Sequence, residues 1–248
     1  MNPFIDYFNY IKDLRKACKS IGLSFKKIGE IHTKAGTYPL YVIVHQPNLS
    51  RKFACISAGI HGNEIAGPLS VLEFVRNQKD TIKECRSNVI IFPVINPVGF
   101  DKNRRINYKN FDLNRHSFDK NPPKEIKLLL KFLRYKNIVF FLSLHEDIDA
   151  KEFYIIYHYR RYPIYNKLLR IASKYCPLMS NKTWEGDAVV KSAILDTTKK
   201  GYMELFMHKK GVNFNVCTET PMKLPLSTRI KCNSALVDFI FNLQQVSL

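Results

Sequence analysis

Short apolar runs of six to nine residues recur along the chain and predict its strands. Several of these runs are apolar at nearly every position, which is typical of strands that helices cover on both faces. Alternating runs bounded by polar and turn residues also favour strands. We therefore predict six strands, at 38–45, 53–60, 88–96, 137–145, 152–159 and 213–218.

Between these runs, apolar residues recur at the three- and four-residue spacing of amphipathic helices. The segment 122–136 begins with two prolines and then places Ile126, Leu129, Leu130 and Leu133 on one face. Strands that alternate with helices predict an α/β sandwich around a mainly parallel or mixed sheet. We predict further helices over 67–78, 163–176 and 227–246, and an amphipathic helix over the first 20 residues.

The chain shows no Gly/Ser/Pro-rich linker, so we expect one domain over residues 1–248. Residues 177–212 look like one long excursion between regular elements. Long loops inside compact domains are often functional, so this segment is expected to wall a specificity pocket.

Composition excludes several classes of protein. The chain is 46% hydrophobic and 24% charged, as in soluble globular proteins, and no run reaches the roughly 18 apolar residues of a spanning helix. The N-terminus lacks the features of a signal peptide, and six scattered single cysteines fit a reducing compartment, so we expect a cytoplasmic protein. The net charge of +18 is spread along the chain, so we expect no specific nucleic-acid face.

Polar side chains follow four of the predicted strands. His61 and Glu64 come after the second strand, and His145 ends the fourth strand. Glu219 follows the last strand, and Asn114 and Arg115 lie in the loop after the third strand. In open α/β sheets, sites form at the carboxyl ends of strands. We therefore expect these side chains to converge.

These residue types suit a catalytic zinc site. Two histidines and one carboxylate are a standard ligand set that leaves a position for water, and His61, Glu64 and His145 provide it. Glu219 could then act as a general base, and Arg115 could bind a substrate carboxylate through two hydrogen bonds.

Each residue also has a simpler interpretation when it is taken alone. A His-x-x-Glu pair often occurs by chance, and His145 could be a capping residue beside the competing acids Glu146 and Asp147. The histidine at 158 is interpreted as structural, and the arginines could be surface charges.

Five motifs taken in order resemble the zinc carboxypeptidase family, which includes murein peptide amidases and, more distantly, succinylglutamate desuccinylase and aspartoacylase. The resemblance spans about residues 40–225. It implies a three-layer α/β/α sandwich around a mixed, mostly parallel sheet of about eight strands. The motifs are "GIHGNE", "NPVGF", "RRINYKNFDLNRHSF", "SLHED" and "TETP".

The resemblance also implies a role for each matching residue. His61, Glu64 and His145 would hold one zinc ion, and Glu219 would be the catalytic glutamate. Arg105 would polarise the scissile carbonyl, although the neighbouring Arg104 could take that role. Asn114 and Arg115 would bind the terminal carboxylate of the substrate, and Tyr202 is the nearest candidate for the tyrosine that covers it.

Three functional hypotheses remain open at this point. The leading hypothesis is a zinc-dependent metallocarboxypeptidase that hydrolyses an amide bond adjacent to a free carboxylate in a peptide. The second keeps the fold and changes the substrate, to an N-acyl amino acid as in the desuccinylase and aspartoacylase branch, or to a murein peptide. The third is a basic binding protein with an inactive site, which the charge of +18 alone supports.

Overall fold

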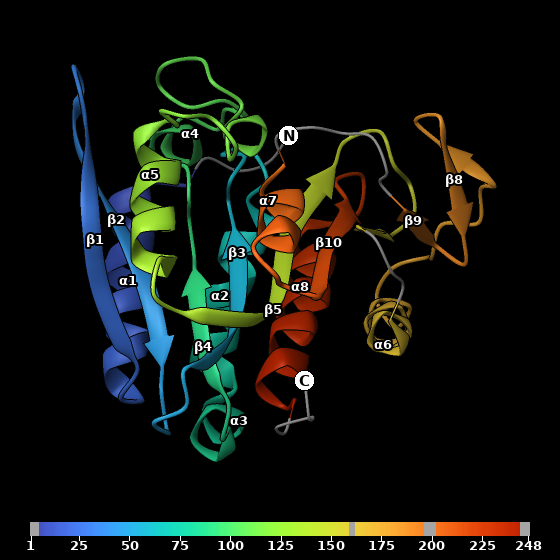
Figure 1. Ribbon diagram of the computed structural model, residues 1–248, viewed down its shortest axis with the longest axis horizontal. Helices are drawn as coiled ribbons and strands as arrows, with labels where there is room; N and C mark the ends of the chain where they lie inside the picture. Colours follow the sequence, from blue (N-terminus) through green and yellow to red (C-terminus); the bar gives the residue numbers. More distant parts are fainter. Residues whose placement is uncertain (1–4, 159–161, 196–201, 244–248) are drawn as a thin grey trace.

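A ten-stranded mixed sheet runs through the whole molecule (Figure 1). The computed structural model describes residues 5–158, 162–195 and 202–243. The strand order is β1-β2-β4-β3-β5-β10-β6-β9-β8-β7. The strands are β1 (Ser24–Thr33), β2 (Gly36–His45), β3 (Lys52–Ala58), β4 (Asn88–Phe92), β5 (Asn137–Asp147), β6 (Tyr154–Tyr157), β7 (Thr183–Trp184), β8 (Asp187–Val190), β9 (Ala193–Leu195) and β10 (Phe214–Pro221).

The centre of the sheet is parallel. Strands β4, β3, β5 and β10 are neighbours that run in the same direction, whereas β2 and β6 pair antiparallel to the two sides of this group. The carboxyl ends of the four central strands therefore meet at one edge, where sites of open α/β sheets form.

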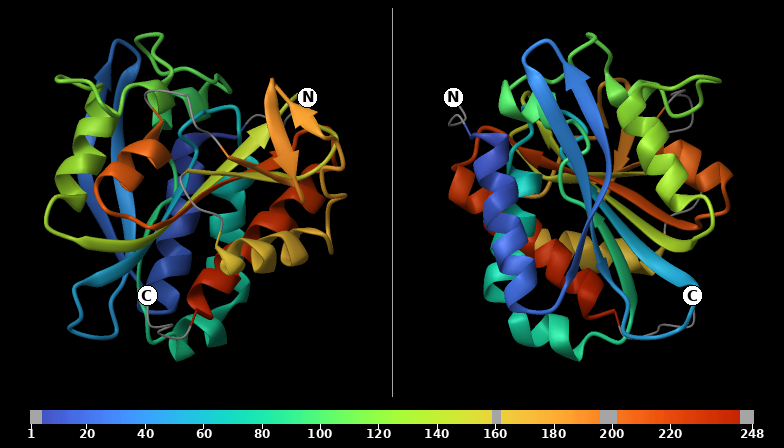
Figure 2. Two further views of the ribbon diagram at one scale, coloured as in Figure 1. Left: turned by 45° about the vertical axis from the view of Figure 1, so that its right-hand side comes forward. Right: turned by 90° about the vertical axis from the view of Figure 1, so that its left-hand side faces the viewer.

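Helices cover both faces of the sheet (Figure 2). The helices α1, α2 and α8 pack on one face, and α5 and α7 lie on the other. The helices are α1 (Tyr7–Ser20), α2 (Ala66–Asn77), α3 (Lys79–Glu84), α4 (Pro97–Asp101), α5 (Lys124–Leu133), α6 (Pro163–Ala172), α7 (Met203–Lys209) and α8 (Leu226–Phe241), with a 3₁₀ turn η1 (Leu113–Arg115).

The continuous apolar runs follow from this double coverage. All five residues of β4 are buried: Val89 and Ile91 belong to the core beneath α1, α2 and α8, whereas Ile90 and Phe92 belong to the core beneath α5 and α7. Successive strand residues point to opposite faces, so a strand with a core on each side has no polar face.

The α/β/α sandwich predicted from the sequence is confirmed, with a strand in each of the six predicted runs. Strands β3 and β4 end earlier than predicted, at Ala58 and Phe92, whereas β5 and β10 run beyond their predicted ends, to Asp147 and Pro221. Residue Pro93, which has no N–H to donate, follows β4, and Gly59, with φ 59°, follows β3. Parts of the predictions at residues 1–4, 159, 196–201 and 244–246 lie outside the described residues.

Two expectations about regular structure are wrong. The sheet has ten strands rather than about eight, and residues 177–212 contain β7, β8, β9 and α7 rather than one irregular excursion. The extra edge strands β7, β8 and β9 span only two to four residues, too few for a periodic pattern. Strand β1 was also missed, because Ile31 is its only fully buried residue.

The first helix is attached to the centre of the molecule through one buried acid. Asp101, at the end of α4, accepts hydrogen bonds from the backbone N–H of Tyr7 at 3.1 Å and from the hydroxyl of Tyr38 at 2.9 Å. Lys102 forms an ion pair with the same carboxylate at 2.9 Å. A single side chain thus joins α1, β2 and α4.

Within the part of the chain that the structure describes, every helix is too short or too polar to cross a membrane.

Candidate metal and substrate site

A pocket of about 300 Å³ opens at the carboxyl ends of the central parallel strands. The structure brings all of the candidate residues from the sequence together in its lining: His61, Glu64, Arg105, Asn114, Arg115, His145, Tyr202 and Glu219. They come from six separate segments of the chain, so the convergence expected from the strand ends is observed.

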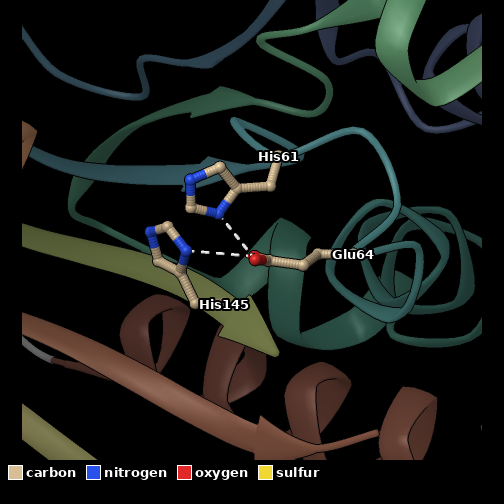
Figure 3. Close-up of side chains that lie close together, drawn as sticks. All are labelled: His61, Glu64 and His145. Carbon is tan, nitrogen blue, oxygen red and sulfur yellow. Dashed lines mark hydrogen bonds and ion pairs between the residues drawn. The ribbon is translucent and has the colours of Figure 1, made fainter. Parts of the chain in front are cut away.

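Two histidines and a glutamate meet at the base of this pocket (Figure 3). The Nδ1 atom of His61 lies 2.6 Å from Oε1 of Glu64, and Nδ1 of His145 lies 3.0 Å from Oε2 of the same carboxylate. All three side chains are at most 3% exposed. One donor atom from each residue lies within 4.8 Å of the others, so the group could hold a metal ion.

Each histidine also contacts a second carboxylate, through the ring nitrogen that does not face Glu64. The Nε2 atom of His61 lies 3.0 Å from Oδ1 of Asp112, and Nε2 of His145 lies 3.4 Å from Oε1 of Glu204. Both rings therefore direct Nδ1 toward Glu64 and Nε2 toward an acid. Such an outer carboxylate fixes the tautomer and the orientation of a metal-binding histidine.

The electrostatics of the group favour ionised carboxylates. Burial alone would raise the pKa of Glu64, but the two histidines next to it lower that pKa well below its ordinary range. Burial opposes ionisation of Asp112 as well, yet His61 and the nearby arginines lower its pKa below its ordinary range. Buried ionised carboxylates with two histidines between them form an environment that attracts a cation.

Close packing against α4 shapes the turn that carries His61 and Glu64. A Cβ atom on Gly62 would lie 2.0 Å from the backbone carbon of Gly99, so neither glycine position has room for a side chain. The N–H of Gly62 also donates to the carbonyl of Arg105 at 3.3 Å. Close contact between two chain segments is therefore the reason for a glycine at position 62.

Arg105, and not Arg104, faces the pocket. The Arg105 guanidinium lies 3.3 Å from Oε1 of Glu64 and 3.2 Å from Oδ2 of Asp112, and its side chain remains 46% exposed. The Arg104 guanidinium instead donates to the side chain of Asn110 at 2.9 Å and is not part of the pocket lining. Of the two arginines, only Arg105 therefore lines the pocket.

The start of α7 holds the predicted carboxylate-binding residues. Asn114 is buried, and its Oδ1 accepts a hydrogen bond of 2.9 Å from the N–H of Met203. The guanidinium carbon of Arg115 lies 3.8 Å from the ring centroid of Tyr202, a cation–π contact. Tyr202, the candidate for the substrate-covering tyrosine, therefore lies against Arg115.

Glu219 faces the pocket from the end of β10. Burial, with the negative charges of Glu64 and Asp147 adding to it, raises its pKa to about 8 even though His145 acts in the opposite direction. The thiol of Cys217 lies 3.7 Å from its Oε1. A carboxylate with a pKa near neutrality can both accept and release a proton.

Sequence reasoning assigned no role to several residues that shape this site. Asp112 lies inside the motif "RRINYKNFDLNRHSF", so its position two residues before Asn114 was a usable signal. Glu204 carried no signal, because its segment was interpreted as a loop. Histidine 158, interpreted as structural, is buried and also lines the pocket.

Comparison with known proteins places this arrangement in a family. The model of the succinylglutamate desuccinylase/aspartoacylase catalytic domain matches residues 51–193, more than half of the chain. No curated protein matched the sequence.

Solved structures support the same assignment. A candidate metallopeptidase from Shewanella amazonensis is similar with a TM-score of 0.84 at 26% identity, over 96% of this chain and 93% of that chain. A metallo-carboxypeptidase from Burkholderia cenocepacia gives a TM-score of 0.72 at 14% identity, over 95% and 68% of the two chains, and shows the shared fold. Together with the family model, these similarities indicate a hydrolase of the metallocarboxypeptidase or deacylase type. The chain therefore belongs to the succinylglutamate desuccinylase/aspartoacylase family, within the zinc carboxypeptidase-like group of proteins.

Proposed function

We propose that the protein is a zinc-dependent metallocarboxypeptidase that hydrolyses an amide bond next to a free carboxylate of a peptide. One observation carries this proposal: a His–Glu–His group, a carboxylate base and two arginines line the same pocket. The group has the donor types of a catalytic zinc site, two imidazoles and one carboxylate.

The residues fit a zinc ion. The two Nδ1 atoms and the Glu64 carboxylate already face one another, and both Nε2 atoms are turned toward acids that would keep them protonated. When bound at His61, Glu64 and His145, zinc supplies a Lewis acid that polarises a carbonyl and makes water more acidic.

The side chains around the metal group supply the remaining chemistry. Glu219 takes a proton from the attacking water and passes it to the leaving nitrogen, a role supported by its place in the lining of the same pocket. Arg105 donates hydrogen bonds to the carbonyl oxygen as negative charge develops on it. Asn114 and Arg115 bind the terminal carboxylate and so place the scissile bond, and Tyr202 covers the substrate from the Arg115 side.

The test compares two substrates that differ in one group. Zinc-loaded protein, with its metal content measured, is assayed on an N-acyl dipeptide with a free terminal carboxylate and on the same compound as its C-terminal amide. We expect one zinc per chain and cleavage of the acid at least about 100-fold faster, since a positioning contact is lost in the amide. Equal rates, or a protein that binds no zinc, would contradict the proposal.

A second candidate is an N-acyl amino acid deacylase, which the match to the desuccinylase/aspartoacylase catalytic domain favours. Its substrates also present a carboxylate to Arg115. Release of amino acid from N-acetyl- and N-succinyl-amino acids, measured beside the dipeptide and a murein peptide, separates the candidates by relative kcat/KM.

A further inference from the structure

Glu204 lies on the far side of His145 from Glu64. The two nitrogens of the His145 ring point in different directions, Nδ1 toward Glu64 at 3.0 Å and Nε2 toward Oε1 of Glu204 at 3.4 Å. Both Nε2 of His145 and Oε1 of Glu204 are buried, and within the described part of the chain neither has a hydrogen-bond partner. Two unsatisfied polar atoms, one of which can donate and the other accept, thus face each other at 3.4 Å.

The position of Glu204 is fixed by its surroundings. Its side chain is 3% exposed, and it is the second residue of α7. Its backbone carbonyl accepts a hydrogen bond from the side chain of Asn215 on β10.

Glu204 forms no ion pair with an arginine or lysine among the described residues. Of the arginines in the pocket lining, Arg105 pairs with Glu64 and Asp112, and Arg115 lies over the ring of Tyr202. A buried polar atom without a partner is unfavourable, and Nε2 of His145, which faces Oε1 of Glu204 at 3.4 Å, is the group placed to donate to it.

The arrangement around His145 repeats the one around His61. Asp112 contacts Nε2 of His61 from the 3₁₀ turn side, and Glu204 contacts Nε2 of His145 from α7. Each histidine thus has one acid on the Nδ1 side, which they share, and its own acid on the Nε2 side. That is the pattern of carboxylate–histidine–metal triads.

We propose that Glu204 is a positioning residue that holds the His145 ring with Nδ1 toward Glu64 and a proton on Nε2, and so orients His145 in the metal site of His61, Glu64 and His145. This inference rests on the proposed function, because it assigns Glu204 to the same metal site. The proposal also predicts that substitution of Glu204 affects metal binding more than binding of the substrate carboxylate. The reason is that α7 contacts Asn114 through the backbone N–H of Met203 and not through Glu204.

The test measures zinc affinity in the absence of substrate. Wild type, Glu204→Gln and Glu125→Gln are prepared without metal, and the zinc Kd of each is measured by competition with a chromogenic chelator. Glu125 is the matched control because it is another buried glutamate, on α5, outside the pocket lining. We expect Glu204→Gln to bind zinc about 10–100-fold more weakly, and Glu125→Gln to bind it as wild type does.

Further readouts distinguish a positioning role from general loss of structure. The far-ultraviolet circular dichroism of the metal-free proteins should coincide, and the cobalt(II) absorption spectrum should change in Glu204→Gln but not in the control. KM should change little while kcat falls, and Glu204→Asp, which restores the charge with a shorter reach, should recover part of the zinc affinity.

Three results would overturn the inference. A wild-type zinc Kd in Glu204→Gln rejects the role of Glu204 and leaves the proposed function intact, whereas wild type that binds no zinc rejects both. If Glu204→Gln does not fold, a long-range proton–nitrogen spectrum of zinc-loaded wild type decides. We expect a protonated, slowly exchanging Nε2 on His145, and zinc bound to that nitrogen would contradict the proposal.

Discussion

At the residue scale, two neighbouring side chains of the same type make different contacts in the fold. Arg104 and Arg105 are adjacent in sequence, yet Arg105 contacts Glu64 and Asp112 whereas Arg104 contacts Asn110. The sequence alone did not show which of the two arginines faces the site. Side-chain direction in an irregular loop follows no periodic pattern, so it cannot be predicted from the sequence. The ordered motifs identified His61, Glu64 and His145 as the metal group. The acids that contact the Nε2 atoms of the two histidines, Asp112 and Glu204, were recognised only in the structure.

This difference gives a direct prediction for the two arginines. We expect Arg105→Lys to lower kcat by about 10²–10³-fold, because a donor to the developing oxyanion is displaced. Arg104→Lys should leave kcat and KM unchanged. Steady-state kinetics of the two variants on one dipeptide test this, and an equal loss in both variants would mean that the pocket-facing position of Arg105 is irrelevant to the reaction.

At the element scale, apolar pattern predicted the central strands well and the edges poorly. Strand β4 is buried on both faces and was predicted from its unbroken apolar run, whereas β1 buries only Ile31 fully and was missed. Helix α7 was missed because it spans only seven residues, although it carries Glu204 and contacts Asn114. Short elements are defined by tertiary contacts, which local periodicity does not record.

Helix α1 offers a test of how one buried acid holds an element in place. Asp101→Asn weakens hydrogen bonds from Tyr7 and Tyr38 to a charged group, and we expect a loss of about 1.5–3 kcal/mol in unfolding free energy at pH 7. Denaturant unfolding followed by circular dichroism measures this loss.

The same variant makes a prediction about pH. Burial acts to raise the pKa of Asp101, but its hydrogen bonds with Lys102, Tyr7 and Tyr38 lower it overall. A carboxyl group whose pKa is lower in the folded than in the unfolded state stabilises the fold above the unfolded pKa of about 3.9 and loses that contribution as pH falls through the folded pKa. The gap between wild type and Asp101→Asn should therefore be constant above pH 5 and shrink below pH 4. A gap that grows in acid would contradict this assignment.

At the scale of the whole molecule, metal binding should stabilise the fold. His61 and Glu64 follow β3, and His145 lies on β5, so an ion held by all three joins distant parts of the chain. An ion that binds only the folded state at about 1,000 times its Kd adds about 4 kcal/mol. For a chain of this size we expect zinc to raise Tm by roughly 10 °C.

Scanning calorimetry of metal-free and zinc-loaded protein measures this shift, and magnesium at the same concentration is the control because it prefers oxygen ligands. The same Tm with zinc as without it would show that the buried group does not hold the ion.

The central claim is that a zinc-loaded pocket hydrolyses an amide with Glu219 as its base, and turnover by zinc-loaded Glu219→Gln tests it most directly. The substitution preserves the shape of the side chain and removes its ability to accept the proton. With zinc content equal to that of wild type, we predict a loss of at least about 100-fold in kcat on a dipeptide with a free carboxylate. Unimpaired turnover by the fully loaded variant would contradict the account.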